Sequence, residues 1–190
     1  MTDSQTDRKN GLKTDSASGL KLNQGHNKQD KLFIAIGSAG GFGLSPYMPG
    51  TCGAFTGVLL HVAVVSFMPS SLQWPCLFML FALVCIANHA LTDWAELFWQ
   101  EKDPKHFVLD EVAGYLVVPI LFSGGALFKT VFWGFTLFRI FDIFKLIPPA
   151  RWVDENIHGP WGILLDDLVS AGYAVIIMYG MLWFRPEWLI

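Results

Sequence analysis

The sequence predicts an all-α protein: a bundle of apolar helices set in a membrane, with no sheet. Hydrophobic residues make up 53% of the 190-residue chain and charged residues only 15%, whereas soluble domains usually carry roughly 25% charge. The apolar residues occur in runs of helical length, separated by glycine, proline and polar segments. No run alternates between apolar and polar residues for long, so strands with one wet face are not indicated.

Two regions are predicted, a polar and flexible tail over residues 1–31 and a helical membrane domain over residues 32–190. The tail is rich in Ser, Asn, Gln, Asp and Lys and has no hydrophobic period. Its excess of Lys and Arg favours the cytoplasmic side of a membrane. The domain holds more acidic than basic residues, which excludes nucleic-acid binding because a phosphate backbone requires a basic surface.

The predicted helices follow a loop rich in glycine and proline over residues 37–53. A wet, amphipathic segment over residues 92–105 interrupts the apolar series and ends near Pro104. The helix over 72–91 has about the twenty residues needed to cross a bilayer. The apolar segments of helical length are residues 54–68, 72–91, 112–122, 127–146 and 168–184.

Five carboxylates next to or inside these apolar helices are the main indication of function. They are Asp110, Glu111, Asp142, Asp166 and Asp167. Charge near or in lipid costs about 2.5–3.5 kcal/mol per residue, so it usually marks a partner or a site. Gathered carboxylates repel one another unless a cation or protons neutralise them, and oxygen ligands of this kind suit Mg²⁺. The alternative for the two adjacent pairs is helix capping, which leaves Asp142 unexplained because it lies inside a helix.

Basic side chains near these acids are candidates for binding phosphate. Arg139, Asp142 and Lys145 are three residues apart and share one helix face, an arrangement that suits a phosphate beside a metal. The alternative is a ladder of Arg, Asp and Lys that neutralises itself. Arg151 and His158 follow in sequence, and the alternatives for them are a membrane-surface arginine and a loop histidine.

Residues 49–51 lead directly into the first apolar helix. The backbone N–H groups there and the Thr51 hydroxyl could receive an anion at the helix N-terminus. A helix cap by Thr51 is the compatible alternative.

Four motifs occur in order along the chain. They are Gly-Leu-Ser-Pro-x-x-Pro-Gly-Thr-x-Gly (43–53), Lys-Asp-Pro-x-x-x-Val-x-Asp-Glu-x-x-Gly (102–114), Phe-Arg-x-x-Asp-x-x-Lys (138–145) and Arg-Trp-x-Asp-x-x-x-His-Gly-x-x-Gly-x-x-x-Asp-Asp (151–167). Together they resemble the phosphatidylglycerophosphatase A family, and the resemblance covers essentially everything after the tail.

The resemblance implies a helical, Mg²⁺-dependent membrane enzyme. Such an enzyme removes the terminal phosphate of phosphatidylglycerophosphate and releases phosphatidylglycerol and inorganic phosphate. We accordingly expect a multi-pass protein of the bacterial inner membrane, with its tail in the cytoplasm and its active site near the cytoplasmic interface. The expected partners are the phospholipid substrate and the bilayer, with no nucleic acid and no protein partner.

Roles can be assigned to the candidate residues on this interpretation. The five carboxylates would bind Mg²⁺ or orient water, and His158 would protonate the leaving glycerol oxygen. Thr51, Arg139, Lys145 and Arg151 would bind the phosphate oxygens. The number of metal ions, and whether a carboxylate or water attacks phosphorus, stay open. The alternative function is an ion or proton carrier, whose carboxylates would form a relay through the membrane.

Overall fold

The computed structural model describes residues 28–144 and 160–190, and the statements below refer to these residues. The chain divides into two compact units, residues 1–33 and residues 34–190. Of the first unit the structure describes residues 28–33, which form the opening turns of α1 (Lys28–Gly37). The described residues form helices and turns and no strand, which confirms the predicted all-α class.

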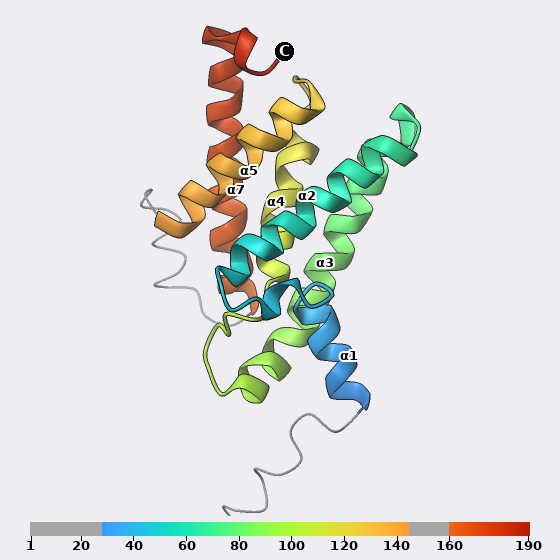
Figure 1. Ribbon diagram of the computed structural model, residues 1–190, viewed down its shortest axis with the longest axis vertical. Helices are drawn as coiled ribbons and strands as arrows, with labels where there is room; N and C mark the ends of the chain where they lie inside the picture. Colours follow the sequence, from blue (N-terminus) through green and yellow to red (C-terminus); the bar gives the residue numbers. More distant parts are fainter. Residues whose placement is uncertain (1–27, 145–159) are drawn as a thin grey trace, which may run out of the picture. The chain divides into compact units, whose positions relative to one another are not determined.

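The second unit is built around a short central helix, α4 (Leu109–Leu121). Figure 1 shows α4 among four longer helices, and it packs against all of them. These are α2 (Pro49–Phe67), α3 (Ser70–Trp99), α5 (Leu127–Phe144) and α7 (Pro160–Phe184). Most residues of α4 are buried, which explains why this helix is apolar nearly all the way round.

The main hydrophobic core lies where α4, α5 and α7 meet. Tyr115, Phe138 and Met178 are fully buried there, one from each helix. The C-terminal segment, which contains the short helix η2 (Pro186–Trp188), closes this core. It places the fully buried Leu189 in the same cluster, and the Leu189 carbonyl accepts a hydrogen bond of 2.7 Å from the backbone N–H of Ala126.

Four helices extend beyond their predicted limits, among them α4, which begins at Leu109 and not at residue 112. α2 begins at Pro49 and α7 at Pro160; proline is favoured at a helix start because the missing N–H would have no partner there. α3 is one helix of 30 residues that joins the apolar segment 72–91 to most of the amphipathic segment 92–105. Asp93 and Glu96 of the second segment lie on the continuing helix, which ends at Trp99, and Glu101, Lys102 and Asp103 follow it. Between α1 and α2 the glycine-rich segment holds one short helix, η1 (Phe42–Leu44).

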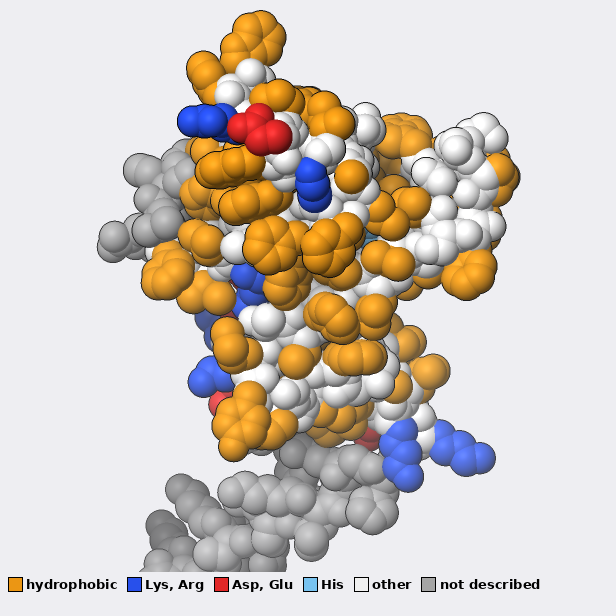
Figure 2. Space-filling view, turned by 45° about the horizontal axis from the view of Figure 1, so that its top comes forward, with side chains coloured by type: hydrophobic (Ala, Val, Ile, Leu, Met, Phe, Trp, Pro, Cys, Tyr) orange, Lys and Arg blue, Asp and Glu red, His pale blue; other side chains and the backbone are white. Residues whose placement is uncertain are grey.

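Hydrophobic side chains cover much of the outer surface of the second unit. Figure 2 shows one face on which orange side chains predominate and charged ones are few. Large exposed hydrophobic residues occur on α2, α3, α5 and α7, an arrangement typical of a surface that meets lipid. In the described part of the chain, α2, α3 and residues Trp161–Phe184 of α7 are long and apolar enough to cross a membrane. α4 is too short to belong to this set and lies inside the bundle.

Candidate active site

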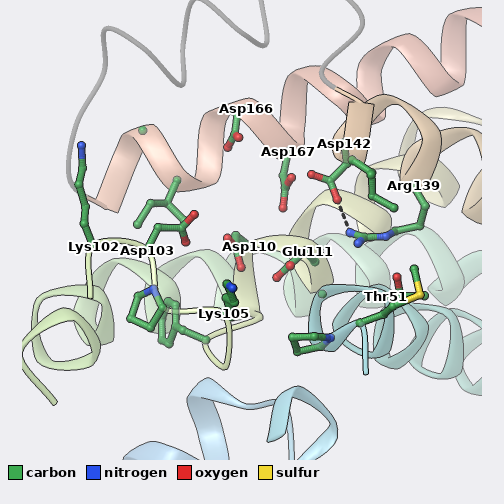
Figure 3. A pocket seen from close by; sticks show the side chains of 18 residues that line it. Thr51, Lys102, Asp103, Lys105, Asp110, Glu111, Arg139, Asp142, Asp166 and Asp167 are labelled. Atoms are coloured by element: carbon green, nitrogen blue, oxygen red, sulfur yellow. Dashed lines mark hydrogen bonds and ion pairs between the residues drawn. The ribbon is translucent and has the colours of Figure 1, made fainter. Parts of the chain in front are cut away.

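Five acidic side chains from three helices line one pocket of about 450 Å³. Asp110 and Glu111 lie in the first turn of α4, Asp142 lies near the end of α5, and Asp166 and Asp167 lie in the second turn of α7. Figure 3 shows their carboxylates turned toward one another across the pocket. The structure therefore brings together all five carboxylates that the sequence indicated, although they are spread over nearly sixty positions.

The capping alternative is wrong for the pair on α7. Because this helix begins at Pro160, Asp166 and Asp167 lie inside it and not at its start. Asp110 and Glu111 do lie in the first turn of α4, but that helix has no side-chain hydrogen bond at its cap residue, Val108. Capping therefore does not account for Asp166 and Asp167, whereas Asp110 and Glu111 do lie where the helix dipole favours acids.

Asp110, Glu111 and Asp167 form the tightest part of the cluster. Each offers one carboxylate oxygen, and these oxygens lie within 4.8 Å of one another. Asp110 is 7% exposed and Asp167 is 3% exposed. One oxygen of each carboxylate is buried and has no hydrogen-bond partner. Buried carboxylate oxygens without partners are costly, and a divalent cation with oxygen ligands would satisfy all three.

The environment of α4 opposes negative charge on its two acids. Burial raises the pKa of Asp110 well above its ordinary range, and the charges of Glu111, Asp103 and Asp166 raise it further. Burial also raises the pKa of Glu111 to about 8, although its hydrogen bond to Asp110 and the nearby Arg139 act in the opposite direction. The surroundings therefore disfavour negative charge on both acids, and a bound cation would offset that cost.

Hydrogen-bond donors lie beside the acids on the α2 and α5 side of the pocket. Arg139 Nη1 donates to Asp142 Oδ2 in an ion pair whose side chains are only 12% and 15% exposed. Arg139 Nε and Thr51 Oγ1 are buried without a hydrogen-bond partner, and both residues line the pocket. Two donors are thus available to an anion. Thr51 is the third residue of α2, whose cap position is Met48, so the interpretation of Thr51 as the cap is wrong.

A close approach between helices explains the glycine that precedes Thr51. A Cβ atom built on Gly50 would collide with Glu111 Oε1 and would lie 3.2 Å from Arg139 Nη2. Only glycine leaves room for the start of α2 to lie against these two side chains. Gly114, one turn further along α4, similarly faces Phe138, with a Cβ at 2.7 Å from its ring.

Three pocket residues were not assigned a role from the sequence. Lys102, Asp103 and Lys105 line the same pocket from the segment between α3 and α4. Lys102 and Asp103 are fixed positions of the 102–114 motif that also contains Asp110, whereas Lys105 is an unspecified position of it. Residues 92–105 were interpreted as a wet, amphipathic segment. Asp103 has a left-handed backbone with φ 55°, a conformation that Asp tolerates better than most residues.

Comparison with known proteins identifies the family. The family model described as phosphatidylglycerophosphatase A matches residues 35–182. The chain belongs to this family. It is therefore a phosphatase, and family membership implies a phospholipid substrate.

Curated relatives are similar to the chain over most of their length. The phosphatidylglycerophosphatases A of Haemophilus influenzae and Escherichia coli K12 are 30% and 31% identical to it, over 78% and 77% of this chain and 86% and 80% of their own. A Bacteroides thetaiotaomicron protein named "Putative phosphatidylinositol-3-phosphatase" is 31% identical over 79% of this chain and 93% of its own. No solved structure gives a significant match.

Three of the predicted site residues, Lys145, Arg151 and His158, lie outside the described residues. Two other histidines form local contacts away from the pocket. His61 Nδ1 lies 3.1 Å from the Tyr115 hydroxyl, and His106 Nδ1 lies 3.0 Å from the Gly43 carbonyl oxygen. Among the described residues, the charged side chains that line the pocket are thus Asp, Glu, Lys and Arg, and no histidine lines it.

Proposed function

We propose that this chain is a Mg²⁺-dependent phosphatase that hydrolyses phosphatidylglycerophosphate to phosphatidylglycerol and inorganic phosphate. The observation that carries the proposal is the approach of Asp110, Glu111 and Asp167 to within 4.8 Å of one another, beside the unpartnered donors of Arg139 and Thr51. Acids and donors in one pocket suit a phosphate monoester together with a cation.

Asp110, Glu111 and Asp167 are the residues that would hold Mg²⁺, because one oxygen from each lies within 4.8 Å of the others and each has an oxygen without a partner. Carboxylates are the preferred protein ligands of this ion. When bound, Mg²⁺ would offset the charge of the phosphate dianion and polarise the phosphoryl group. Asp142 and Asp166 complete the acidic lining, and a carboxylate that is not engaged with the cation can orient water and accept its proton.

Arg139 would fix the phosphate group. Its guanidinium is already held by Asp142, so little side-chain entropy is lost when its remaining N–H groups donate to phosphate oxygens. Thr51 Oγ1 adds a neutral donor from the start of α2. Lys145 and Arg151 are proposed to add further cations, and His158 to protonate the glycerol oxygen as its bond to phosphorus breaks.

Phosphate release from purified protein in detergent tests this proposal. We expect turnover of phosphatidylglycerophosphate with Mg²⁺, loss of turnover with EDTA, and recovery when Mg²⁺ is added in excess. Phosphatidylinositol 3-phosphate should be assayed in parallel, because one relative is named for that activity. A preference for that lipid would revise the substrate, and turnover that is insensitive to EDTA would overturn the metal dependence.

The gathering of the acids argues against the carrier alternative. A carrier needs titratable groups spread along the path of the ion, whereas all five predicted carboxylates line one pocket.

We also propose the bacterial inner membrane as the location, with residues 1–31 and the pocket on the cytoplasmic side. The basic excess of the tail supports this orientation. Cysteines introduced into the tail and at Lys105 should be labelled by a membrane-impermeant maleimide in inverted inner-membrane vesicles but not in intact spheroplasts. The reverse pattern would contradict the orientation.

A further inference from the structure

We propose that Lys102 and Lys105 bind the phosphodiester of the substrate lipid and thereby select lipids that carry two phosphates. The two residues are called the lysine rim below. This inference rests on the proposed function, because it assigns the part of the pocket that the reacting phosphate does not use.

Lys102 and the buried donors lie on opposite sides of the acids. Figure 3 shows Lys102 on one side of the carboxylates and Arg139 and Thr51 on the other, with Lys105 next to Asp110. All four residues line the same pocket of about 450 Å³. The pocket therefore offers positive or donor groups at two ends with the acids between them, which suits a ligand with two separated anionic groups.

The two ends of the pocket differ in burial and in whether their cationic side chains already form an ion pair. Arg139 is mostly buried and paired with Asp142. Lys102 and Lys105 are exposed, and neither forms an ion pair with another described residue. The buried end is suited to the reacting phosphate, which must be fixed and shielded from water, and the exposed rim is suited to a group that stays near the lipid surface.

The two lysines do not contribute equally. Lys102 also borders a second depression that contains Asp93, Glu96 and Glu101, a depression that Lys105 does not line. Asp103 lies between the lysines in sequence and leaves the segment 102–105 with a net positive charge. Lys105 should accordingly be the stronger of the two phosphodiester contacts.

The proposed substrate carries a second anionic group that such a site would bind. Phosphatidylglycerophosphate carries a terminal phosphate monoester and, across a glycerol, a phosphodiester that joins it to diacylglycerol. The diester keeps its negative charge throughout the reaction, close to five carboxylates, and the lysine rim offsets this repulsion. Because the diester does not react, its contacts stabilise the bound substrate and the transition state equally. Loss of the rim should therefore raise KM and leave kcat nearly unchanged.

The test compares wild-type protein with Lys102→Gln, Lys105→Gln and the double variant, all in detergent with Mg²⁺. We expect KM for phosphatidylglycerophosphate to rise about tenfold in the double variant, with the larger share from Lys105, and kcat to stay within about twofold. Lys105→Arg should keep most of the wild-type KM because it retains the charge. Arg185→Gln is the matched control, since Arg185 is exposed and does not line the pocket.

Calorimetric titration with two soluble probes provides a readout independent of turnover. The deacylated head group, with both phosphates, should bind the double variant about tenfold more weakly than wild type, and glycerol 3-phosphate, with one monoester, should bind both proteins equally. An equal loss for both probes, a fall in kcat at constant KM, or no change would overturn the inference. Absence of turnover in the wild-type protein would instead overturn the proposed function. Because the probe titrations do not depend on turnover, they test the lysine rim separately from the proposed function.

Discussion

Gly50 of α2 and Glu111 of α4 lie so close that any side chain at position 50 would occupy the space of a Glu111 carboxylate oxygen. The start of one helix thus sets the position of an acid on another. Arg139 approaches the same glycine, with Nη2 at 3.2 Å from the position of a Cβ. The glycine therefore controls the distance between an acid proposed to bind metal and a cation proposed to bind phosphate.

Gly50→Ala should lower kcat by about 100-fold while the protein stays folded, because displacement of a reacting group by about 1 Å has effects of that size. The measurement is phosphate release, combined with the thermal midpoint in detergent. Gly172→Ala on α7 is the control, because a Cβ there meets no heavy atom within 4 Å. That control should retain activity and gain up to about 1 kcal/mol in stability. Wild-type activity in Gly50→Ala would show that Glu111 need not hold its position.

Glu111→Gln and Asp167→Asn should each weaken Mg²⁺ binding and reduce turnover by at least about 100-fold, because each removes a charged oxygen from the cluster. Mg²⁺ binding is measured by titration calorimetry, separately from activity. Asp93→Asn removes an exposed carboxylate outside the pocket and should change neither quantity. Full Mg²⁺ affinity in both cluster variants would exclude these residues as ligands.

Asp110→Asn should make the metal-free protein more stable, not less. Asp110 is 7% exposed and has a buried oxygen without a partner, so removal of its charge relieves a cost of about 1–2 kcal/mol. In EDTA the thermal midpoint should rise by roughly 2–4 °C for each kcal/mol gained. Saturating Mg²⁺ should stabilise wild type by about 2.7 kcal/mol at 100 times Kd and should stabilise the variant less. Destabilisation of Asp110→Asn in EDTA would mean that local partners already satisfy this carboxylate.

Leu189→Ala should cost about 2–4 kcal/mol of stability, because Leu189 is fully buried in the main core. Its neighbour Ile190 is 68% exposed, and Ile190→Ala should change the thermal midpoint little. Both variants should retain activity well below the midpoint, since neither residue lines the pocket. Equal midpoints for the two variants would show that the C-terminal segment does not complete the core.

The positions of the acids could be predicted from sequence because charge is conspicuous in an apolar background. Asp142 in particular stands in a helix with few charged residues, where a carboxylate without a role is costly. The structure adds that the five acids converge on one pocket. This convergence depends on how α4, α5 and α7 pack around Phe138 and Gly114. Packing of this kind is a long-range property that no local pattern contains.

The helix limits and the lysine rim were less accessible to sequence reasoning. Apolar content alone placed the start of the last helix at residue 168, whereas Pro160 begins it two turns earlier. As a result Asp166 and Asp167 were expected at a helix end and lie within a helix. Lys102 and Lys105 were hidden for a different reason, since exposed lysines on a polar segment are usual and only the fold places them at the pocket.

The length of α3 has a consequence for where the chemistry takes place. A helix of 30 residues rises about 45 Å, whereas the hydrocarbon layer of a bilayer is about 30 Å thick. A single crossing therefore leaves several turns of α3 overhanging the lipid, and its C-terminal end leads into the segment that carries Lys102. In the proposed orientation this overhang would stand in the aqueous layer beside the pocket, where a lipid head group could be held while its acyl chains remain in the membrane.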